Sequence, residues 1–131
     1  MDKIDPKRYN KGKRIIRELL WVGSSRRDLL QMPEQVQSDL GFALYLAQLG
    51  DKHPSAKPLK GFGSAGILEV VEDFDGDAYR AAYTVRFSNA VYVLHCFQKK
   101  STHGIATPKP DSDLIERRLR AAELDSRGKS K

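Results

Sequence analysis

Three apolar segments in the middle of the chain restrict the possible folds most strongly. They are "ILEVVED" (67–73), "AYRAAYTVRF" (78–87) and "AVYVLHCF" (90–97), and all are rich in the β-branched and aromatic residues typical of strands. Asp75-Gly76 lies between the first two, and glycine adopts positive φ without steric cost, which is typical of a tight hairpin. A second turn is expected at Ser88-Asn89. We therefore predict three consecutive antiparallel strands.

Alternation of side chains along these strands predicts two different faces. We expect the first face to be apolar and to pack against a helix, and the second to carry polar groups among valines. The first set is Leu68, Val70, Tyr79, Ala81, Tyr83, Val85, Tyr92, Leu94 and Cys96. The second set is Glu69, Arg80, Ala82, Thr84, Arg86 and His95. A shift of one residue in the pairing would exchange the two faces, so this assignment depends on the turns.

Two helices are predicted before the strands. Residues 26–32 form a short one that Ser24 or Ser25 can cap, and residues 33–49 form a longer one that Gly50 ends. Pro33 suits the first turn of the longer helix because it lacks the N–H group that would have no partner there. The longer helix has one apolar stripe, formed by Val36, Leu40, Ala43, Leu44 and Ala47.

The two ends of the folded region are less regular. "IIRELLWV" (15–22) is read either as a strand or as the start of a helix, and we favour an edge strand. After a polar loop, "DSDLIERRLRAAELDSR" (111–127) predicts a final helix, with Asp111 or Ser112 as its cap. Its apolar positions at helical spacing are Leu114, Ile115, Leu119 and Ala122.

Length and composition indicate one globular domain. The chain has 131 residues, of which 40% are hydrophobic and 31% charged. We expect a basic flexible arm over 1–14, a single domain over 15–126 and a disordered tail over 127–131. The lone cysteine, Cys96, excludes an internal disulfide, and no run is apolar enough to span a membrane. These features favour a cytoplasmic protein without membrane contact.

The formal net charge of +6 makes a polyanion such as nucleic acid a plausible partner. An acidic protein or a lipid surface would satisfy the same charge. Three scattered histidines and one cysteine lack the paired spacing of zinc ligands, so we predict no metal site. "GFGSAG" (61–66) matches a dinucleotide-binding pattern, but it precedes a strand instead of opening a helix. No cofactor is expected.

Basic residues are predicted to converge from separate strands. Arg80 lies on the polar face, Lys57 and Lys60 precede the sheet, and Lys99 and Lys100 follow its last strand. Cleavage of an RNA phosphodiester needs a base, an acid and cations that stabilise the phosphorane, and such residues can supply them. Simpler readings exist as well. Arg80 can form a surface salt bridge with Glu69, His95 can be an ordinary strand histidine, and the lysine pair can protect a sheet edge.

Three motifs together resemble the phage-derived, toxin-like branch of the RelE/HigB superfamily of type II toxin–antitoxin systems. They are K-P-L-K-G (57–61), Y-R-x-x-Y (79–83) and H-x-F-x-K-K-S (95–101), and the resemblance spans roughly residues 19–124. It implies an α+β microbial RNase fold, with an N-terminal helical pair packed on a twisted antiparallel sheet and a C-terminal helix. It also implies a metal-independent mRNA interferase acting at the ribosome, and a helix-turn-helix antitoxin as partner.

Carried over by position, the resemblance implies that Arg80 contacts the scissile phosphate. Lys99 and Lys100 match the family's end-of-strand lysines, and Lys57 and Lys60 match its basic residues before the sheet. The expected catalytic set is Arg80, Lys99, Lys100 and His95; the expected RNA-binding set is Lys57, Lys60, Arg86 and His103. The loop "STHGIA" (101–106) before Thr107-Pro108 departs from the commoner pattern and leaves the role of His103 open.

A non-enzymatic function is the alternative expectation. The ParE branch of the same superfamily poisons gyrase, and a phage protein can also act by binding a host partner. Because ParE-like members tend to lack the basic and histidine set, Arg80 and the lysine pair favour the nuclease.

Overall fold

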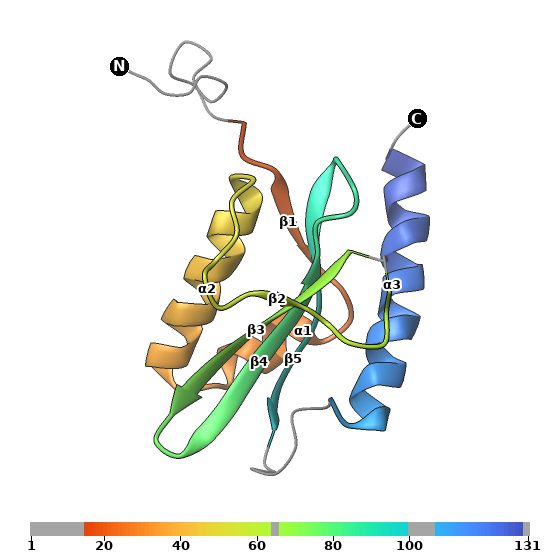
Figure 1. Cartoon of the computed structure of the whole chain (residues 1–131). Helices are drawn as coiled ribbons and strands as arrows, with labels where there is room; N and C mark the ends of the chain where they lie inside the picture. The colour runs from red at the N-terminus through yellow and green to blue at the C-terminus, as the bar shows by residue number, and fades with distance from the viewer. Residues whose placement is uncertain (1–14, 64–65, 100–106, 130–131) are drawn as a thin grey trace, which may run out of the picture.

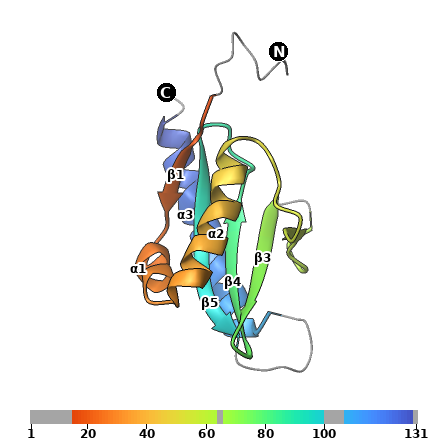
Figure 2. The same cartoon turned by 90° about the vertical axis from the view of Figure 1, so that its left-hand side faces the viewer.

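A five-stranded sheet lies between helices on both of its faces (Figures 1 and 2). The computed structural model describes residues 15–63, 66–99 and 107–129. In chain order its elements are β1 (Glu18–Trp21), α1 (Ser25–Leu30), α2 (Glu34–Gln48), β2 (Lys57–Pro58), β3 (Ile67–Phe74), β4 (Asp77–Thr84), β5 (Ala90–Lys99) and α3 (Lys109–Lys129). The sheet order is β1-β5-β4-β3-β2. The fold class is α+β, as the sequence predicted.

The central meander of β3, β4 and β5 is confirmed. β3 and β4 pair without a break from Ile67↔Thr84 to Phe74↔Asp77. The turn between them places both Asp75 (φ 52°) and Gly76 (φ 88°) in the left-handed region. Two successive positive φ values give a turn whose twist matches that of the flanking strands.

The first strand corrects the expectation of an antiparallel sheet. β1 is an edge strand, as favoured from the sequence, but it pairs with β5 in parallel, from Glu18↔Ala90 to Trp21↔Val93. The sheet is therefore mixed. Parallel neighbours need a long connection, and here the connection contains both helices and the next three strands.

The helical pair α1 and α2 covers one face of the sheet, as predicted. The whole expected stripe of α2 is buried. This stripe packs with Leu29 of α1 and with side chains of β3, β4 and β5 in one apolar cluster. Figure 2 shows α2 in front of the sheet, with α3 behind it.

The opposite face forms a second apolar cluster beneath α3. Ile115, Leu119 and Ala122 of α3 are buried there as expected, whereas Leu114 is half-buried. The helix begins at Lys109 and runs to Lys129, so residues 127–129, which we assigned to the tail, are helical. Among the described residues, no helix is long and apolar enough to cross a membrane.

A shift in strand pairing overturns part of the predicted face assignment. Ala82 pairs with His95, but the next residue, Tyr83, pairs with Val93, so Leu94 is an extra residue in β5. Such a bulge interrupts the two-residue alternation. As a result Tyr92 and Leu94 belong to the cluster beneath α3 and not to the one beneath α2, while Cys96 keeps its predicted face.

Candidate functional site

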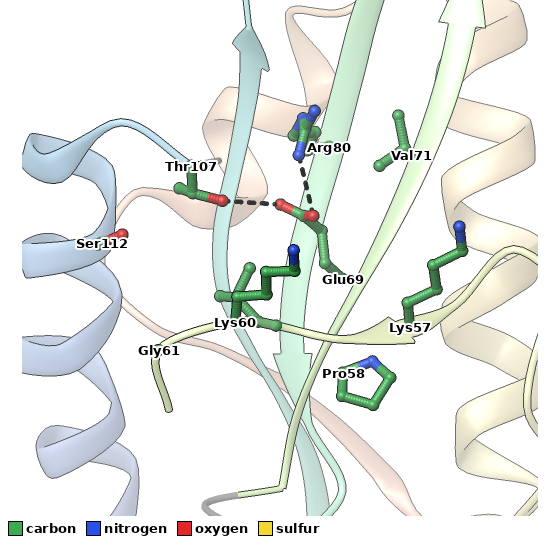
Figure 3. Close-up of a pocket in the computed structure, with 10 residues that line it drawn as sticks. Lys57, Pro58, Lys60, Gly61, Glu69, Val71, Arg80, Thr107 and Ser112 are labelled. Carbon is green, nitrogen blue, oxygen red and sulfur yellow. Dashed lines mark hydrogen bonds and ion pairs between the residues drawn. The ribbon is translucent and has the colours of Figure 1, made fainter. Parts of the chain in front are cut away.

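A pocket of about 370 Å³ opens on the α3 side of the sheet (Figure 3). Its walls come from β2 and the residues after it, from β3 and β4, and from the chain at the start of α3. The lining residues are Lys57, Pro58, Leu59, Lys60, Gly61, Glu69, Val71, Arg80, Thr107 and Ser112. Segments far apart in the sequence therefore meet in one cavity.

Strand register explains why the charged residues meet. Lys57 pairs with Glu69, and Arg80 pairs with Val71 on one side and with Phe97 on the other. Directly paired residues point to the same face of a sheet. All of these side chains therefore point toward the α3 face, as the sequence predicted for Glu69 and Arg80.

Arg80 and Glu69 form an ion pair inside the pocket. Arg80 Nη1 lies 2.9 Å from Glu69 Oε1, and the two side chains are only 10% and 12% exposed. Of the two readings of Arg80, the salt bridge to Glu69 is present, but it is buried and lines a cavity, unlike an ordinary surface pair. Thr107 Oγ1 donates a hydrogen bond to the other carboxylate oxygen at 3.3 Å.

Among the described residues, the guanidinium of Arg80 has a donor without a partner. Arg80 Nε is buried, and no acceptor lies within hydrogen-bonding distance among the described residues. A buried donor without an acceptor is unfavourable, so a ligand oxygen that reached it would be stabilised. Arginine donors fit phosphate and carboxylate oxygens in particular.

The charges around the pocket favour an anion. Lys57 and Lys60 are exposed at the rim formed by β2 and the turn after it. Figure 3 shows the amino group of Lys60 extending toward Glu69, and Ser112 on the α3 side. Among the described residues that line the pocket, Lys57, Lys60 and Arg80 are cationic and only Glu69 is acidic. A phosphate group would therefore be attracted to this pocket.

His95 lies outside the lining of the pocket. Its Nε2 atom is 2.7 Å from Asp111 Oδ1, in the first turn of α3, and its ring stacks on Phe97 with centroids 4.4 Å apart. The side chain is 9% exposed, and Nδ1 has no partner among the described residues. His95 therefore connects the sheet to α3 and does not border the cavity.

The remaining predicted residues fall in different places. Lys99 is buried and pairs with Ala78, which puts it on the same face of the sheet as Phe97 and Arg80. Arg86 is exposed beyond the end of β4, stacks over the ring of Phe87 and does not line the pocket. Lys100 and His103 lie outside the described residues, so their assigned roles stay predictions.

Residues at the start of α3 were not recognised as part of the site. Thr107 contacts Glu69, Ser112 lines the pocket, and Asp111 binds His95. From the sequence, Asp111 and Ser112 were candidates only for capping the helix. The sequence signal that could have pointed to these residues was the Thr-Pro pair directly before the helix. Proline fixes the backbone as the chain enters the first turn, and so fixes where the residues beside it lie.

The described part of the chain contains no group of three or more histidine, cysteine, aspartate or glutamate residues that could hold a metal ion. The polar side chains among the described lining residues are those of Lys57, Lys60, Arg80, Glu69, Thr107 and Ser112.

Comparison with known proteins identifies the family. The model of the family described as phage derived protein Gp49-like (DUF891) matches residues 27–120, which is more than half of the chain and includes the residues that line the pocket. This family is a RelE/HigB-like toxin family of type II toxin–antitoxin systems. Neither the curated proteins nor the solved structures contain a significant match. The chain belongs to the phage derived protein Gp49-like family.

Proposed function

We propose that this protein is the toxin of a type II toxin–antitoxin system and cleaves mRNA at the ribosome without a metal ion. Family membership supports the toxin role. The cationic pocket supports the choice of an RNA phosphate as the reacting group. The proposed partners are mRNA, the ribosome and a helix-turn-helix antitoxin, and the proposed location is the cytoplasm.

The observation that carries the proposal is the state of Arg80. The Arg80 side chain is nine-tenths buried and lines the pocket, and its Nε has no acceptor among the described residues. A cation held in this way is preorganised for charge that develops on a phosphorane. Preorganised donors in a site that excludes water stabilise such charge far more strongly than exposed ones.

The proposed reaction is an in-line transesterification. The 2′-oxygen of the RNA forms a bond to phosphorus, and the bond from phosphorus to the 5′-oxygen breaks. The products are a 2′,3′-cyclic phosphate and a 5′-hydroxyl. Glu69 is the proposed base that accepts the proton of the 2′-hydroxyl, and the position of its carboxylate in the pocket beside Arg80 supports this choice. Lys57 or Lys60, which both line the pocket, is the proposed acid that supplies the proton taken up by the 5′-oxygen.

Two further lysines are proposed to help stabilise the negative charge that develops on the phosphorane. Lys99 lies on the same sheet face as Arg80, and Lys100 follows it in the chain. The net charge of +6 would strengthen binding to ribosomal RNA and make that binding sensitive to salt.

The decisive experiment measures cleavage of a defined mRNA in a translating extract by primer extension. Arg80→Ala should lower the cleavage rate by about two to three orders of magnitude, by analogy with loss of an oxyanion donor. Arg120→Ala is the matched control, because Arg120 is exposed on α3 and pairs only with Glu116 among the described residues. Equal cleavage rates for the Arg80→Ala variant and the parent protein would refute the proposal.

The same extract separates the enzymatic proposal from the alternative. End analysis of the products should find 2′,3′-cyclic phosphates and 5′-hydroxyls, the ends that attack by the 2′-oxygen leaves. A protein that leaves translation intact but induces the DNA-damage response in cells would act as a gyrase poison, which would overturn the nuclease proposal.

A further inference from the structure

A short polar contact fastens the first turn of α3 to the sheet. Asp111 Oδ1 lies 2.7 Å from His95 Nε2, and His95 is held in turn by stacking on Phe97 at an interplanar angle of 11°. Asp111 is the acidic residue of the first turn of α3, where a carboxylate also interacts favourably with the helix dipole. This contact joins β5 to α3 directly beside the pocket.

The chain before α3 is rigidly connected to this contact. The N–H group of Ser112 donates to the carbonyl oxygen of Pro108 at 2.9 Å, so the first turn of the helix includes the residue that follows Thr107. Proline fixes its own φ and restricts the residue before it. A displacement of Asp111 would therefore move Thr107 as well.

Thr107 and Ser112 form the α3 wall of the pocket. Thr107 Oγ1 donates to Glu69 Oε2, while Arg80 binds Oε1, so the carboxylate is held from two sides. The orientation of Glu69 thus depends on where the start of α3 lies. Figure 3 shows Thr107 and Arg80 approaching Glu69 from different elements.

We propose that Asp111 is a positioning residue of the nuclease site. Its bond to His95 fixes the first turn of α3 on β5 and thereby holds Thr107 against Glu69. This inference rests on the proposed function. It gives His95, which was expected in the catalytic set, the part of holding Asp111, because His95 is not among the described residues that line the pocket.

The first test uses cleavage kinetics in three variants. Asp111→Ala should lower kcat about tenfold to a hundredfold, because a misplacement of about 1 Å costs roughly that much. KM should change less than about threefold, since the binding cations are unaltered. Asp111→Asn keeps an acceptor for His95 and should retain most of the rate. Asp113→Ala removes the same charge from an exposed pair with Lys109 and should match the parent.

A second measurement does not require cleavage. The chain has three threonines, Thr84, Thr102 and Thr107, so methyl-labelled threonine gives few NMR signals. Asp111→Ala should shift or broaden the Thr107 methyl signal and change the ring nitrogen signals of His95. Thr84, which donates to the carbonyl oxygen of Gly66, is the internal reference and should not move.

The outcomes separate the two proposals. If the parent protein does not cleave RNA, the proposed function fails, and the NMR measurement still decides whether Asp111 positions Thr107. An unchanged Thr107 signal in Asp111→Ala would overturn the positioning role. So would a parental kcat in that variant, or an Asp113→Ala variant that loses as much activity as Asp111→Ala.

Discussion

Arg118 of α3 donates a hydrogen bond from Nη1 to the carbonyl oxygen of Leu94, at a distance of 2.9 Å. Leu94 is the extra residue at which β5 departs from regular pairing with β4. Nη2 of the same side chain donates to Ser24 Oγ at 3.1 Å, just before α1. One guanidinium thus joins α3, the bulge and the start of the helical pair, and burial lowers its pKa from the usual value.

This relationship predicts a loss of stability when Arg118 is removed. Arg118→Ala should lower the free energy of unfolding by about 1–3 kcal/mol, because the carbonyl of Leu94 loses a partner and bonds to charged donors are stronger than neutral ones. Urea unfolding followed by circular dichroism measures the change. The exposed neighbour Arg117 provides the control: Arg117→Ala should stay within about 0.5 kcal/mol of the parent. Equal losses in the two variants would contradict this account.

The Arg80–Glu69 pair should show strong energetic coupling. Glu69→Gln or Arg80→Met alone leaves one buried charge without its partner, which costs about 3 kcal/mol in comparable pairs. The double variant should lose clearly less than the sum of the two single variants. A double-mutant cycle in urea measures this coupling. Additive losses would indicate that the pair is screened by solvent.

Replacing Gly76 or Gly41 by alanine should change the free energy of unfolding in opposite directions. Gly76 has φ +88° in the β3–β4 turn, where a side chain is strained, so Gly76→Ala should destabilise the protein by about 1–2 kcal/mol. Gly41 lies within α2, and a Cβ there would meet no atom within 4 Å. Gly41→Ala should therefore stabilise it by about 0.5–1 kcal/mol through helix propensity. Thermal unfolding of both variants tests the pair, and a shift of the same sign in both would contradict it.

Stability should fall at alkaline pH because two buried groups resist ionisation. Burial raises the pKa of the Cys96 thiol from 9.0 to about 12, and that of Tyr83 from 10.0 to about 12. The unfolded chain then releases protons at lower pH than the folded one. The contribution of Cys96 is fully present below about pH 9 and is lost as pH rises toward 12, amounting to as much as about 4 kcal/mol.

Urea unfolding at a series of pH values between 8 and about 11 measures this loss. The free energy of unfolding should decline less steeply in Cys96→Ala than in the parent protein. The folded parent should also resist a thiol reagent at pH 8 and react once unfolded, because the thiolate is the reactive form. Rapid labelling of the folded protein would show that Cys96 is not buried in solution.

The sequence predicted those parts of the fold that depend on local patterns. The stripe of α2 and the turn at Asp75-Gly76 follow from helical periodicity and from the conformational freedom of glycine. The bulge at Leu94 was not predictable from the sequence. Helices cover both faces of β5, so residues on both faces are apolar, and the sequence does not show where the alternation between the faces is interrupted. The parallel pairing of β1 with β5 was missed for a related reason. The residue types in 18–21 do not indicate whether a strand pairs in parallel or antiparallel with a strand far away in the sequence.

The candidate site was predictable from the residues of the sheet but not from those of the connections. Alternation placed Arg80 and Glu69 on one face, and the structure places both in one pocket. The burial of His95 beneath α3 depends on Asp111, which is 16 residues away, and no local pattern pairs them. Thr107 reaches Glu69 across 38 residues in the same way.

The parallel pairing of Glu18–Trp21 with Ala90–Val93 affects how the protein is made. During synthesis the first strand cannot form its described pairing in the sheet until Ala90–Val93 have left the ribosome. The pocket is completed even later, because Thr107 and Ser112 follow every strand. A nascent chain therefore lacks a finished site until residues 107–112 have been synthesised.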